Sequence, residues 1–141
     1  MPYRTEAKLF EAGDFISHAG LPLSWKLECD AIHPNEWKAI AKMVMEYQDR
    51  PFYKAVGIPR GGLPFAAAMQ EYASGDPNDQ IMICDDVFTT GTSMLDFIKE
   101  NYPDWTAGQG YRWVVFARQP CYEHPHHVRA LFTMPKPPYK P

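Results

Sequence analysis

The chain has 141 residues, of which 45% are hydrophobic and 22% are charged, so it is long enough for one globular domain with a single core. Its 17 acidic residues outnumber its 14 lysines and arginines, and no basic run is present, which argues against a nucleic-acid binding protein. No apolar stretch reaches the roughly 18 residues of a membrane span, and the first residues carry no signal-peptide core, so we expect a cytoplasmic protein. The three cysteines form no CxxC pair, which argues against a disulfide framework.

The first helix is predicted from Pro34 onward, in the stretch PNEWKAIAKMVMEYQDR. Four apolar residues there follow the spacing of one buried helical face. They are Trp37, Ile40, Ala41 and Val44. The next segment, YKAVGI at residues 53–58, is a short apolar run that stops at Pro59, so we expect a strand that enters a turn.

A second helix is predicted in LPFAAAMQEYAS, which begins at Leu63 and has Pro64 in its first turn. Four of its side chains share one face. They are Phe65, Ala68, Met69 and Tyr72. The following GDPND is a cluster of turn residues that separates this helix from the next element.

Four more elements are predicted in the carboxyl-terminal half. IMIC at 81–84 is a continuously apolar, buried strand, and SMLDFIKENY at 93–102 is a helix. The helical spacing is that of Met94, Phe97, Ile98 and Tyr102. YRWVVFA at 111–117 and VRALFTM at 128–134 are two further strands. This alternation predicts an α/β fold with a parallel sheet of about four strands, whose ligand sites lie beyond the carboxyl ends of the strands.

IMICDDVFTTGTS, residues 81–93, joins the strand at 81–84 to the helix that follows it. A helix amino terminus exposes free N–H groups and partial positive charge, which suits a phosphate, and Gly91 allows the backbone to approach closely. The hydroxyl donors are Thr89, Thr90, Thr92 and Ser93. Asp85 and Asp86 would repel a phosphate, so we expect them to face a sugar diol, or a hard cation such as Mg²⁺ bound to the same ligand.

The alternative interpretation of this stretch is a solvated acidic turn before an ordinary Ser/Thr helix cap. Other phosphate sites are excluded by the sequence, because no GxxxxGK[ST] is present and no GxGxxG follows a strand. A receiver domain places its acidic pair after the first strand, whereas only 55 residues follow Asp86 here. A sugar phosphate site accounts for both the carboxylates and the hydroxyls.

The same thirteen residues resemble the 5-phosphoribosyl-1-pyrophosphate (PRPP) binding motif of type I phosphoribosyltransferases. Phe88 is a mild departure, because that family more often has an aliphatic residue there. The resemblance implies that Asp85 and Asp86 contact the ribose 2′ and 3′ hydroxyls, and that residues 89–93 surround the 5′-phosphate. It also implies Mg²⁺ as a cofactor, held by the two aspartates indirectly, through ribose hydroxyls or water.

VGIPRGG, residues 56–62, again ends a strand in a glycine turn and is similar to the pyrophosphate loop of the same family. By itself, a PRGG segment is more often an ordinary turn. The resemblance implies that Arg60 pairs with the leaving diphosphate and is the catalytic residue. Gly61 and Gly62 then allow backbone contact with that group.

FISHAGLPLSWKLECD, residues 15–30, loosely resembles the hood of orotate phosphoribosyltransferases. The matching positions are Phe15, Gly20 and Ser24. His18 stands where a lysine is usual, and one residue is inserted. The resemblance implies that the backbone near Lys26 faces the base, while the alternative is an amino-terminal strand that only packs.

The segment VVFARQP ends the strand at 111–117, and its ARQ resembles the DRQ of orotate enzymes. Arg118 is the residue implied to contact the carboxylate or carbonyl edge of the base, because a guanidinium binds a carboxylate through two parallel hydrogen bonds. A purine-type enzyme can use the same position for an exocyclic oxygen. The base is therefore open between orotate and a purine.

Residues 63–80 are the main departure from the family. These 18 residues lie between Gly62 and Ile81, and the predicted helix uses most of them. Full-length relatives normally have an extra strand and a long mobile loop there, which closes over PRPP and brings basic catalytic residues. Charge stabilisation of the transition state then depends on Arg60, Mg²⁺ and a partner subunit.

The resemblance implies one phosphoribosyltransferase-like domain at 1–134, with a hood at about 1–32 and a core at about 33–134, followed by a proline-rich tail at 135–141. It also implies a homodimer. CYEHPHH at 121–127 gathers one cysteine and three histidines, but its spacing matches no common structural zinc pattern, so we do not expect a zinc site.

Three functions follow from these observations. The first is a Mg²⁺-dependent pentosyltransferase that transfers ribose 5-phosphate from PRPP to a nucleobase, with orotate favoured. The second is a PRPP- or nucleotide-binding protein of the same fold without turnover, which the missing loop suggests. The third is a nucleoside 5′-phosphate hydrolase.

Overall fold

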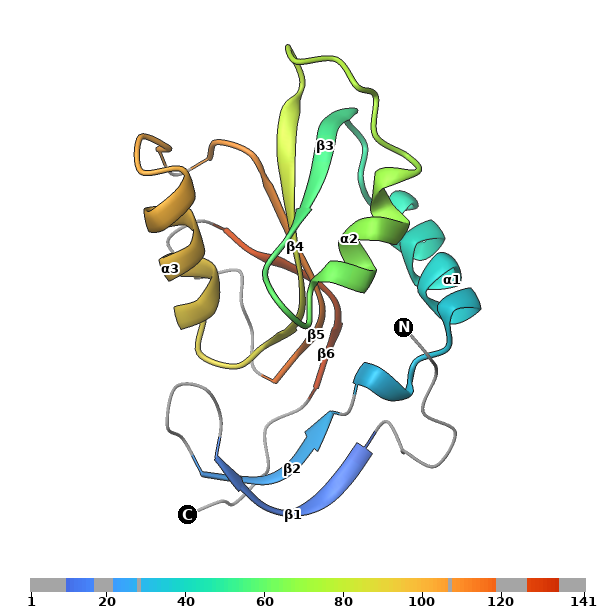
Figure 1. Ribbon diagram of the computed structural model, residues 1–141, viewed down its shortest axis with the longest axis vertical. Helices are drawn as coiled ribbons and strands as arrows, with labels where there is room; N and C mark the ends of the chain where they lie inside the picture. Colours follow the sequence, from blue (N-terminus) through green and yellow to red (C-terminus); the bar gives the residue numbers. More distant parts are fainter. Residues whose placement is uncertain (1–9, 17–21, 28, 107, 119–126, 135–141) are drawn as a thin grey trace.

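A computed structural model describes residues 10–16, 22–27, 29–106, 108–118 and 127–134. The core is a parallel sheet of four strands in the order β3 (Phe52–Gly57), β4 (Gln80–Phe88), β5 (Tyr111–Ala117) and β6 (Arg129–Thr133). The predicted α/β class and the four parallel strands are therefore confirmed (Figure 1).

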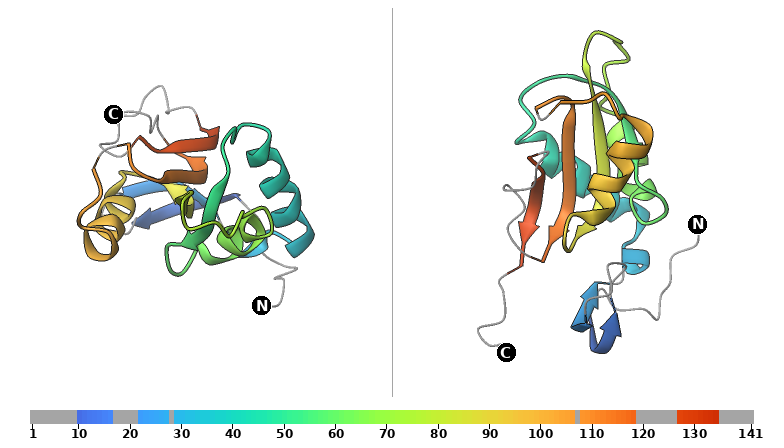
Figure 2. Two further views of the ribbon diagram at one scale, coloured as in Figure 1. Left: turned by 90° about the horizontal axis from the view of Figure 1, so that it is seen from above. Right: turned by 90° about the vertical axis from the view of Figure 1, so that its left-hand side faces the viewer.

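Helices cover both faces of this sheet. α1 (Pro34–Met45) and α2 (Leu63–Gln70) lie on one face, and α3 (Thr92–Asn101) lies on the other (Figures 1 and 2). Each face has its own apolar cluster: one includes Trp37, Phe65 and Met82, and the other includes Ile83, Met94 and Ile98. Successive residues of β4, such as Met82 and Ile83, thus point to opposite layers, as strand geometry requires.

The predicted first helix is confirmed, with Trp37, Ala41 and Val44 buried on its inner face and Ile40 half-buried. Its start is fixed by His33, whose side chain accepts a hydrogen bond from the Asn35 N–H. The Glu36 side chain in turn accepts from the His33 N–H at 2.8 Å, which completes a capping box.

The second helix is shorter than predicted. α2 ends at Gln70, so Tyr72 lies beyond it and is 43% exposed rather than buried. The chain leaves the helix because residues 71–79 turn toward the outer edge of β3, where Ser74 and Gly75 donate to the carbonyls of Phe52 and Tyr53. Gln70 also caps this edge by accepting from the Ala55 N–H at 2.9 Å.

The connection at 71–79 lies at the amino ends of β3 and β4 (Figure 1). α2 takes eight of the residues between Gly62 and Ile81 rather than most of them. The rest of that segment is used to return the chain to the start of β4. It therefore lies at the end of the sheet opposite the carboxyl ends of the strands.

β4 is longer than predicted, because it continues through the two aspartates to Phe88 instead of ending after Cys84. α3 then begins after Gly91, which has a φ of 87°, a conformation that glycine adopts without strain. Met94 and Ile98 are buried beneath this helix, while Phe97 and Tyr102 are half-buried.

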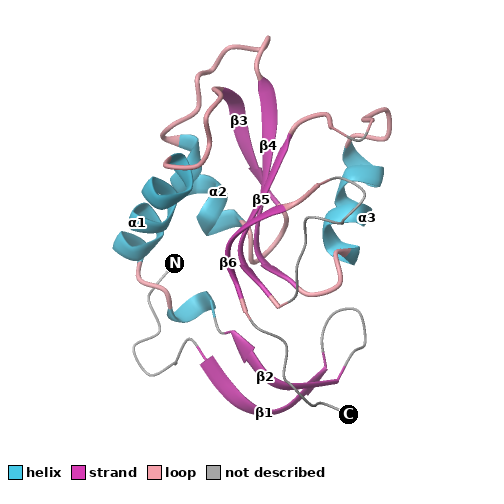
Figure 3. Ribbon diagram, turned by 180° about the vertical axis from the view of Figure 1, so that it is seen from behind, coloured by secondary structure: helices cyan, strands magenta, loops and turns pink. Residues whose placement is uncertain are grey.

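The hood is an antiparallel hairpin of β1 (Phe10–Ile16) and β2 (Pro22–Leu27), joined to α1 through the short 3-10 helix Cys29–Ala31. It lies beyond the carboxyl ends of the parallel strands (Figures 1 and 3). The last strand, β6, pairs with β5 in the main sheet and is not part of the hairpin. No helix among the described residues is long and apolar enough to cross a membrane.

Candidate functional site

Two loops that the sequence singled out meet at the carboxyl edge of the sheet. The arginine loop, residues 58–62, follows β3, and the threonine loop, residues 89–93, follows β4. The Ile58 N–H donates to the Cys84 carbonyl at 2.9 Å, so the arginine loop starts while still bonded to β4. The Gly62 N–H then donates back to the Ile58 carbonyl at 2.9 Å, which closes the turn and leads into α2.

The arginine loop touches the acidic pair directly. A Cβ atom placed on Gly61 would lie 2.4 Å from Oδ2 of Asp86, and one on Gly62 would lie 2.5 Å from the carbonyl oxygen of Cys84. Both distances are shorter than real Cβ contacts allow, so a side chain at Gly61 would have to displace the Asp86 carboxylate, and one at Gly62 would clash with backbone atoms. In the sequence 24 residues lie between Gly61 and Asp86, and the structure brings the two into contact.

The two aspartates have different environments. Asp85 is only 8% exposed, and its Oδ1 accepts from the Asp86 N–H at 2.9 Å. Asp86 is half-buried and accepts from the Val87 N–H at 2.8 Å. Burial raises the pKa of the Asp85 carboxyl well above its ordinary value, and the negative charge of Asp86 raises it further. A cation or hydroxyl donor beside this pair would relieve that electrostatic strain.

The threonine loop surrounds the amino terminus of α3, a position that suits an anion. Gly91 is the N-cap of α3 and makes no side-chain cap, and Thr90, Thr92 and Ser93 are exposed around it. The hydroxyls of Thr90 and Thr92 lie 2.9 Å apart and bond to each other. The Thr92 N–H donates to the Thr90 hydroxyl over a long distance of 3.4 Å. The loop therefore combines the amino terminus of a ten-residue helix with three exposed hydroxyl side chains.

Arg118 lies at the same edge, directly after β5. Its N–H donates to the Phe88 carbonyl at 2.9 Å, which fixes it beside the start of the threonine loop. The side chain is half-buried, and burial lowers the pKa of its guanidinium. Arg60, in contrast, is exposed, with a cis peptide bond between Pro59 and Arg60.

The base-side predictions are only partly covered by the described residues. Lys26 lies in β2, opposite Glu11, and the structure describes its backbone alone. His18, Gly20, the tail at 135–141 and all of the CYEHPHH segment except His127 lie outside the described residues. Cys121 is therefore not placed.

The candidate magnesium ligands are the two adjacent carboxylates, Asp85 and Asp86. Within the described ranges, no group of three or more His, Cys, Asp or Glu side chains is gathered into a metal cage. This donor set fits Mg²⁺, which keeps several waters and is usually bound through one or two carboxylates plus ligand phosphates.

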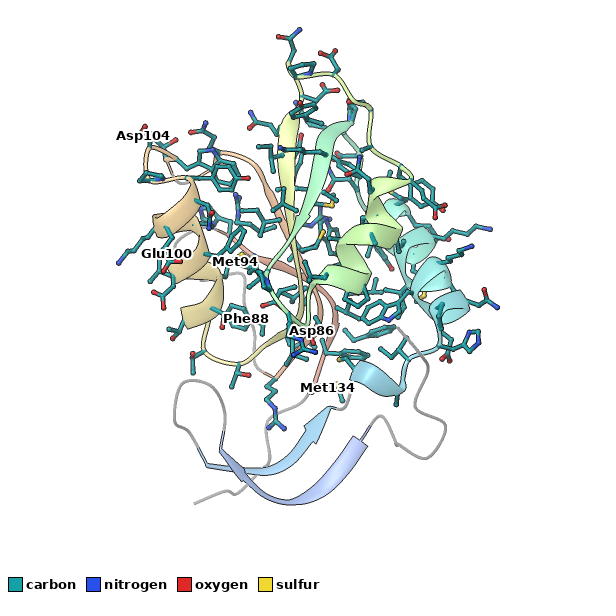
Figure 4. The ribbon with its side chains drawn as sticks, viewed as in Figure 1. Asp86, Phe88, Met94, Glu100, Asp104 and Met134 are labelled. Carbon is teal, nitrogen blue, oxygen red and sulfur yellow. The ribbon has the colours of Figure 1, made fainter. Side chains whose placement is uncertain are left out.

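Sequence reasoning missed two residues at this edge. The Met134 N–H donates to the Ala117 carbonyl at 2.7 Å, so Met134 continues the pairing beyond β6, and Figure 4 places it at the hood side of the sheet. Phe88 was treated only as a departure from a motif, yet its carbonyl holds Arg118. Backbone partners of this kind have no sequence pattern, because any residue type supplies a carbonyl.

Sequence comparison does not classify the chain, because no family model matches it and no curated protein is similar to it in sequence. Structural comparison identifies its fold. UMP synthase of Leishmania donovani has a TM-score of 0.70 and 15% identity over 89% of this chain and 33% of its own. Orotate phosphoribosyltransferase from Aeropyrum pernix has a TM-score of 0.65 and 20% identity, with 89% and 88% covered. The orotate phosphoribosyltransferase of Mycobacterium tuberculosis has a TM-score of 0.62 and 16% identity, with 88% and 89% covered.

These likenesses establish the fold. The chain has the α/β fold of the type I phosphoribosyltransferases, in the form found in orotate phosphoribosyltransferases. It spans a third of the Leishmania chain and nearly the full length of the other two. The fold that the thirteen-residue motif implied is thereby confirmed.

Proposed function

We propose that the protein is a phosphoribosyltransferase that transfers ribose 5-phosphate from PRPP to orotate and releases pyrophosphate. The observation that carries this proposal is the contact between Gly61 of the arginine loop and the Asp86 carboxylate. That contact brings the arginine loop beside the two aspartates, which the threonine loop follows. This order supports a site for the diphosphate, pentose and phosphate of PRPP.

Each end of the donor has a matching group in the protein. The amino terminus of α3 and its hydroxyls hold the 5-phosphate, and Asp85 and Asp86 accept from the ribose 2′ and 3′ hydroxyls. Arg60 is exposed at the other end, where its guanidinium pairs with the diphosphate through parallel hydrogen bonds. Arg118, fixed to Phe88 beside the threonine loop, faces the base.

The reaction breaks the bond between C1 and the diphosphate oxygen, which takes the electron pair, and forms a bond between C1 and a ring nitrogen of the base. The proton of that nitrogen is lost to the released diphosphate or to water. Arg60 stabilises the charge that develops on the leaving diphosphate. The carboxylates hold the ribose so that C1 lies between the leaving diphosphate and the base. Mg²⁺, held beside Asp85 and Asp86, would neutralise part of the diphosphate charge.

The assay combines purified protein, Mg²⁺ and PRPP with orotate, and follows the ultraviolet absorbance of orotate. Uracil, hypoxanthine, guanine and adenine are tested in parallel. Asp86→Asn should abolish turnover, whereas Asp96→Asn, the same change on the exposed side of α3, should not. Turnover with a purine and not with orotate would change the assigned base from orotate to that purine. Unchanged absorbance with every base would refute the proposed phosphoribosyl transfer.

A second candidate is a PRPP- or nucleotide-binding protein without turnover. It is favoured by residues 71–79, which lie at the amino ends of the strands and so cannot cover the site. Calorimetry that detects PRPP binding, together with no product from any base, would support it. Release of free base from a nucleoside 5′-phosphate without pyrophosphate would instead indicate the hydrolase.

The proposal includes a homodimer, on the strength of the resemblance alone. Sedimentation equilibrium with and without PRPP measures this directly. A monomer at assay concentration that still turns over orotate would remove the partner subunit from the mechanism.

A further inference from the structure

Phe88 lies where the segments of the proposed site meet. It is the last residue of β4 and directly precedes the threonine loop. Its side chain is only 5% exposed. Figure 4 shows it at the carboxyl end of β4, on the side where α3 and Met94 lie. A buried ring at this position can act on the loops around it without touching a ligand.

The ring belongs to the apolar cluster between the sheet and α3, which contains residues from each neighbouring segment. Ile58, 7% exposed, is the first residue of the arginine loop, and Met94, 2% exposed, directly follows the threonine loop. Ala117 and Val128, both buried, flank the segment that begins with Arg118. All four belong to the same packed cluster as Phe88.

The backbone of Phe88 adds a second connection. Its carbonyl accepts from the Arg118 N–H at 2.9 Å. The arginine loop is linked to the same strand through the Ile58 N–H and the Cys84 carbonyl. These two hydrogen bonds tie the arginine loop and the segment after β5 to β4. They leave side-chain packing to set the tilt and separation of the arginine loop and the threonine loop. Because protein interiors are close-packed, a change in side-chain volume of even one methylene shifts the neighbouring residues.

We infer that Phe88 is a positioning residue that fixes the separation of the arginine loop and the threonine loop, and so selects ligands with an anionic group at each end. This inference rests on the proposed function, since PRPP is the ligand that spans both loops. Ribose 5-phosphate reaches only the threonine loop and the aspartates, and pyrophosphate reaches only the arginine loop. An error in loop separation therefore penalises PRPP far more than either fragment.

The test measures dissociation constants for PRPP, ribose 5-phosphate and pyrophosphate by calorimetry, all with Mg²⁺. For Phe88→Leu we expect PRPP to bind about tenfold more weakly or worse, because small misplacements are costly, while each fragment stays within about twofold. Phe88→Met, whose flexible, unbranched side chain can adapt better to the space left by the ring, should lie between the wild type and Phe88→Leu. If Phe88→Leu does not fold, Phe88→Met is expected to show the same selective loss, only smaller.

Phe52→Leu is the matched control. Phe52 is fully buried in the cluster on the opposite face and lies at the amino end of β3, paired with Gln80. It should lose thermal stability without a selective loss of PRPP binding. If Phe88→Leu weakens the binding of all three ligands equally, or if Phe52→Leu also loses PRPP binding selectively, then Phe88 has only a structural role.

Failure of the inference can be told from failure of the proposed function. A wild-type protein that binds none of the three ligands would end both. A wild-type protein that binds PRPP more tightly than its fragments, while Phe88→Leu keeps that preference, would end the inference alone.

Discussion

Gly61 is the residue at which the proposed site has least room. A Cβ atom there would lie within 3 Å of three atoms of the Asp86 carboxylate, so Gly61→Ala must push that group away and break its bond to the Val87 N–H. We expect about 1–3 kcal/mol lower stability, as for other overpacked sites, and PRPP binding weakened by about tenfold or more. Calorimetry and thermal unfolding measure the two effects.

Gly75→Ala is the control for this substitution. Gly75 has a φ of 74° and nothing within 4 Å of an added Cβ, so alanine there costs backbone strain of roughly 1–2 kcal/mol without a clash. It lies in the connection at the far end of the sheet. Loss of PRPP binding in Gly75→Ala, or its retention in Gly61→Ala, would contradict the role given to Gly61.

Asp85 gives a pH dependence whose sign follows from its burial. Its folded pKa is above the ordinary 3.8, so the folded state binds this proton more tightly than the unfolded state does. The contribution of Asp85 to the stability of the folded state is complete when the pH is below 3.8, its ordinary pKa. That contribution is lost as the pH rises through the folded pKa. Asp85→Asn keeps the oxygen that accepts from the Asp86 N–H and removes the charge.

We therefore expect Asp85→Asn to be more stable than the wild type without ligand, by an amount that grows from pH 4 toward neutrality. Urea unfolding over this range measures the difference. Asp96→Asn on exposed α3 should show no such trend. A wild-type protein whose advantage over Asp85→Asn increases with pH would mean that the carboxylate is stabilised by a partner rather than strained.

At the scale of the elements, the connection at 71–79 tests whether function is confined to the carboxyl edge. Ser74 donates to Asp79 Oδ2 at 2.6 Å and accepts from the Asp76 N–H at 3.1 Å. Ser74→Ala should cost about 1 kcal/mol, the usual worth of such bonds, and leave PRPP affinity unchanged. A drop in affinity beyond about twofold would mean that this connection reaches the site after all.

The elements also show how far sequence reasoning extends. Apolar periodicity located every strand of the sheet and all three α-helices, because burial of one face or one stripe dominates these segments. It predicted the ends of some elements wrongly. Tyr72 was predicted inside α2, which ends at Gln70, and β4 was predicted to end at Cys84, whereas the strand runs to Phe88. Those ends are set by tertiary hydrogen bonds, such as Ser74 to Phe52, that no local pattern encodes.

The site follows the same division. The residue types around Gly91 predicted an anion site because glycine, hydroxyls and a helix start suffice for that chemistry. The contact between Gly61 and Asp86 could be reached only through the resemblance, since it depends on two strands being neighbours. The role inferred for Phe88 required the packed cluster itself.

At the scale of the whole molecule, the arginine loop leads into α2 on one face of the sheet, and the threonine loop leads into α3 on the other. PRPP bound across both loops would stabilise the helices on both faces of the sheet, whereas ribose 5-phosphate would stabilise only α3. At a free ligand concentration of 100 times its dissociation constant, either ligand adds about 2.7 kcal/mol to the free energy of unfolding. The two ligands should therefore differ in where they protect the chain.

Hydrogen exchange distinguishes the two patterns. With PRPP and Mg²⁺ we expect slower exchange in the first turns of both α2 and α3, at Gly62 and Leu63 and at Thr92 and Ser93. Ribose 5-phosphate should protect only the second pair, and pyrophosphate only the first. Because opening of each loop is local, its amides report the ligand that holds it and not global stability. Protection of α3 alone by PRPP would show that the diphosphate end is not held by the arginine loop.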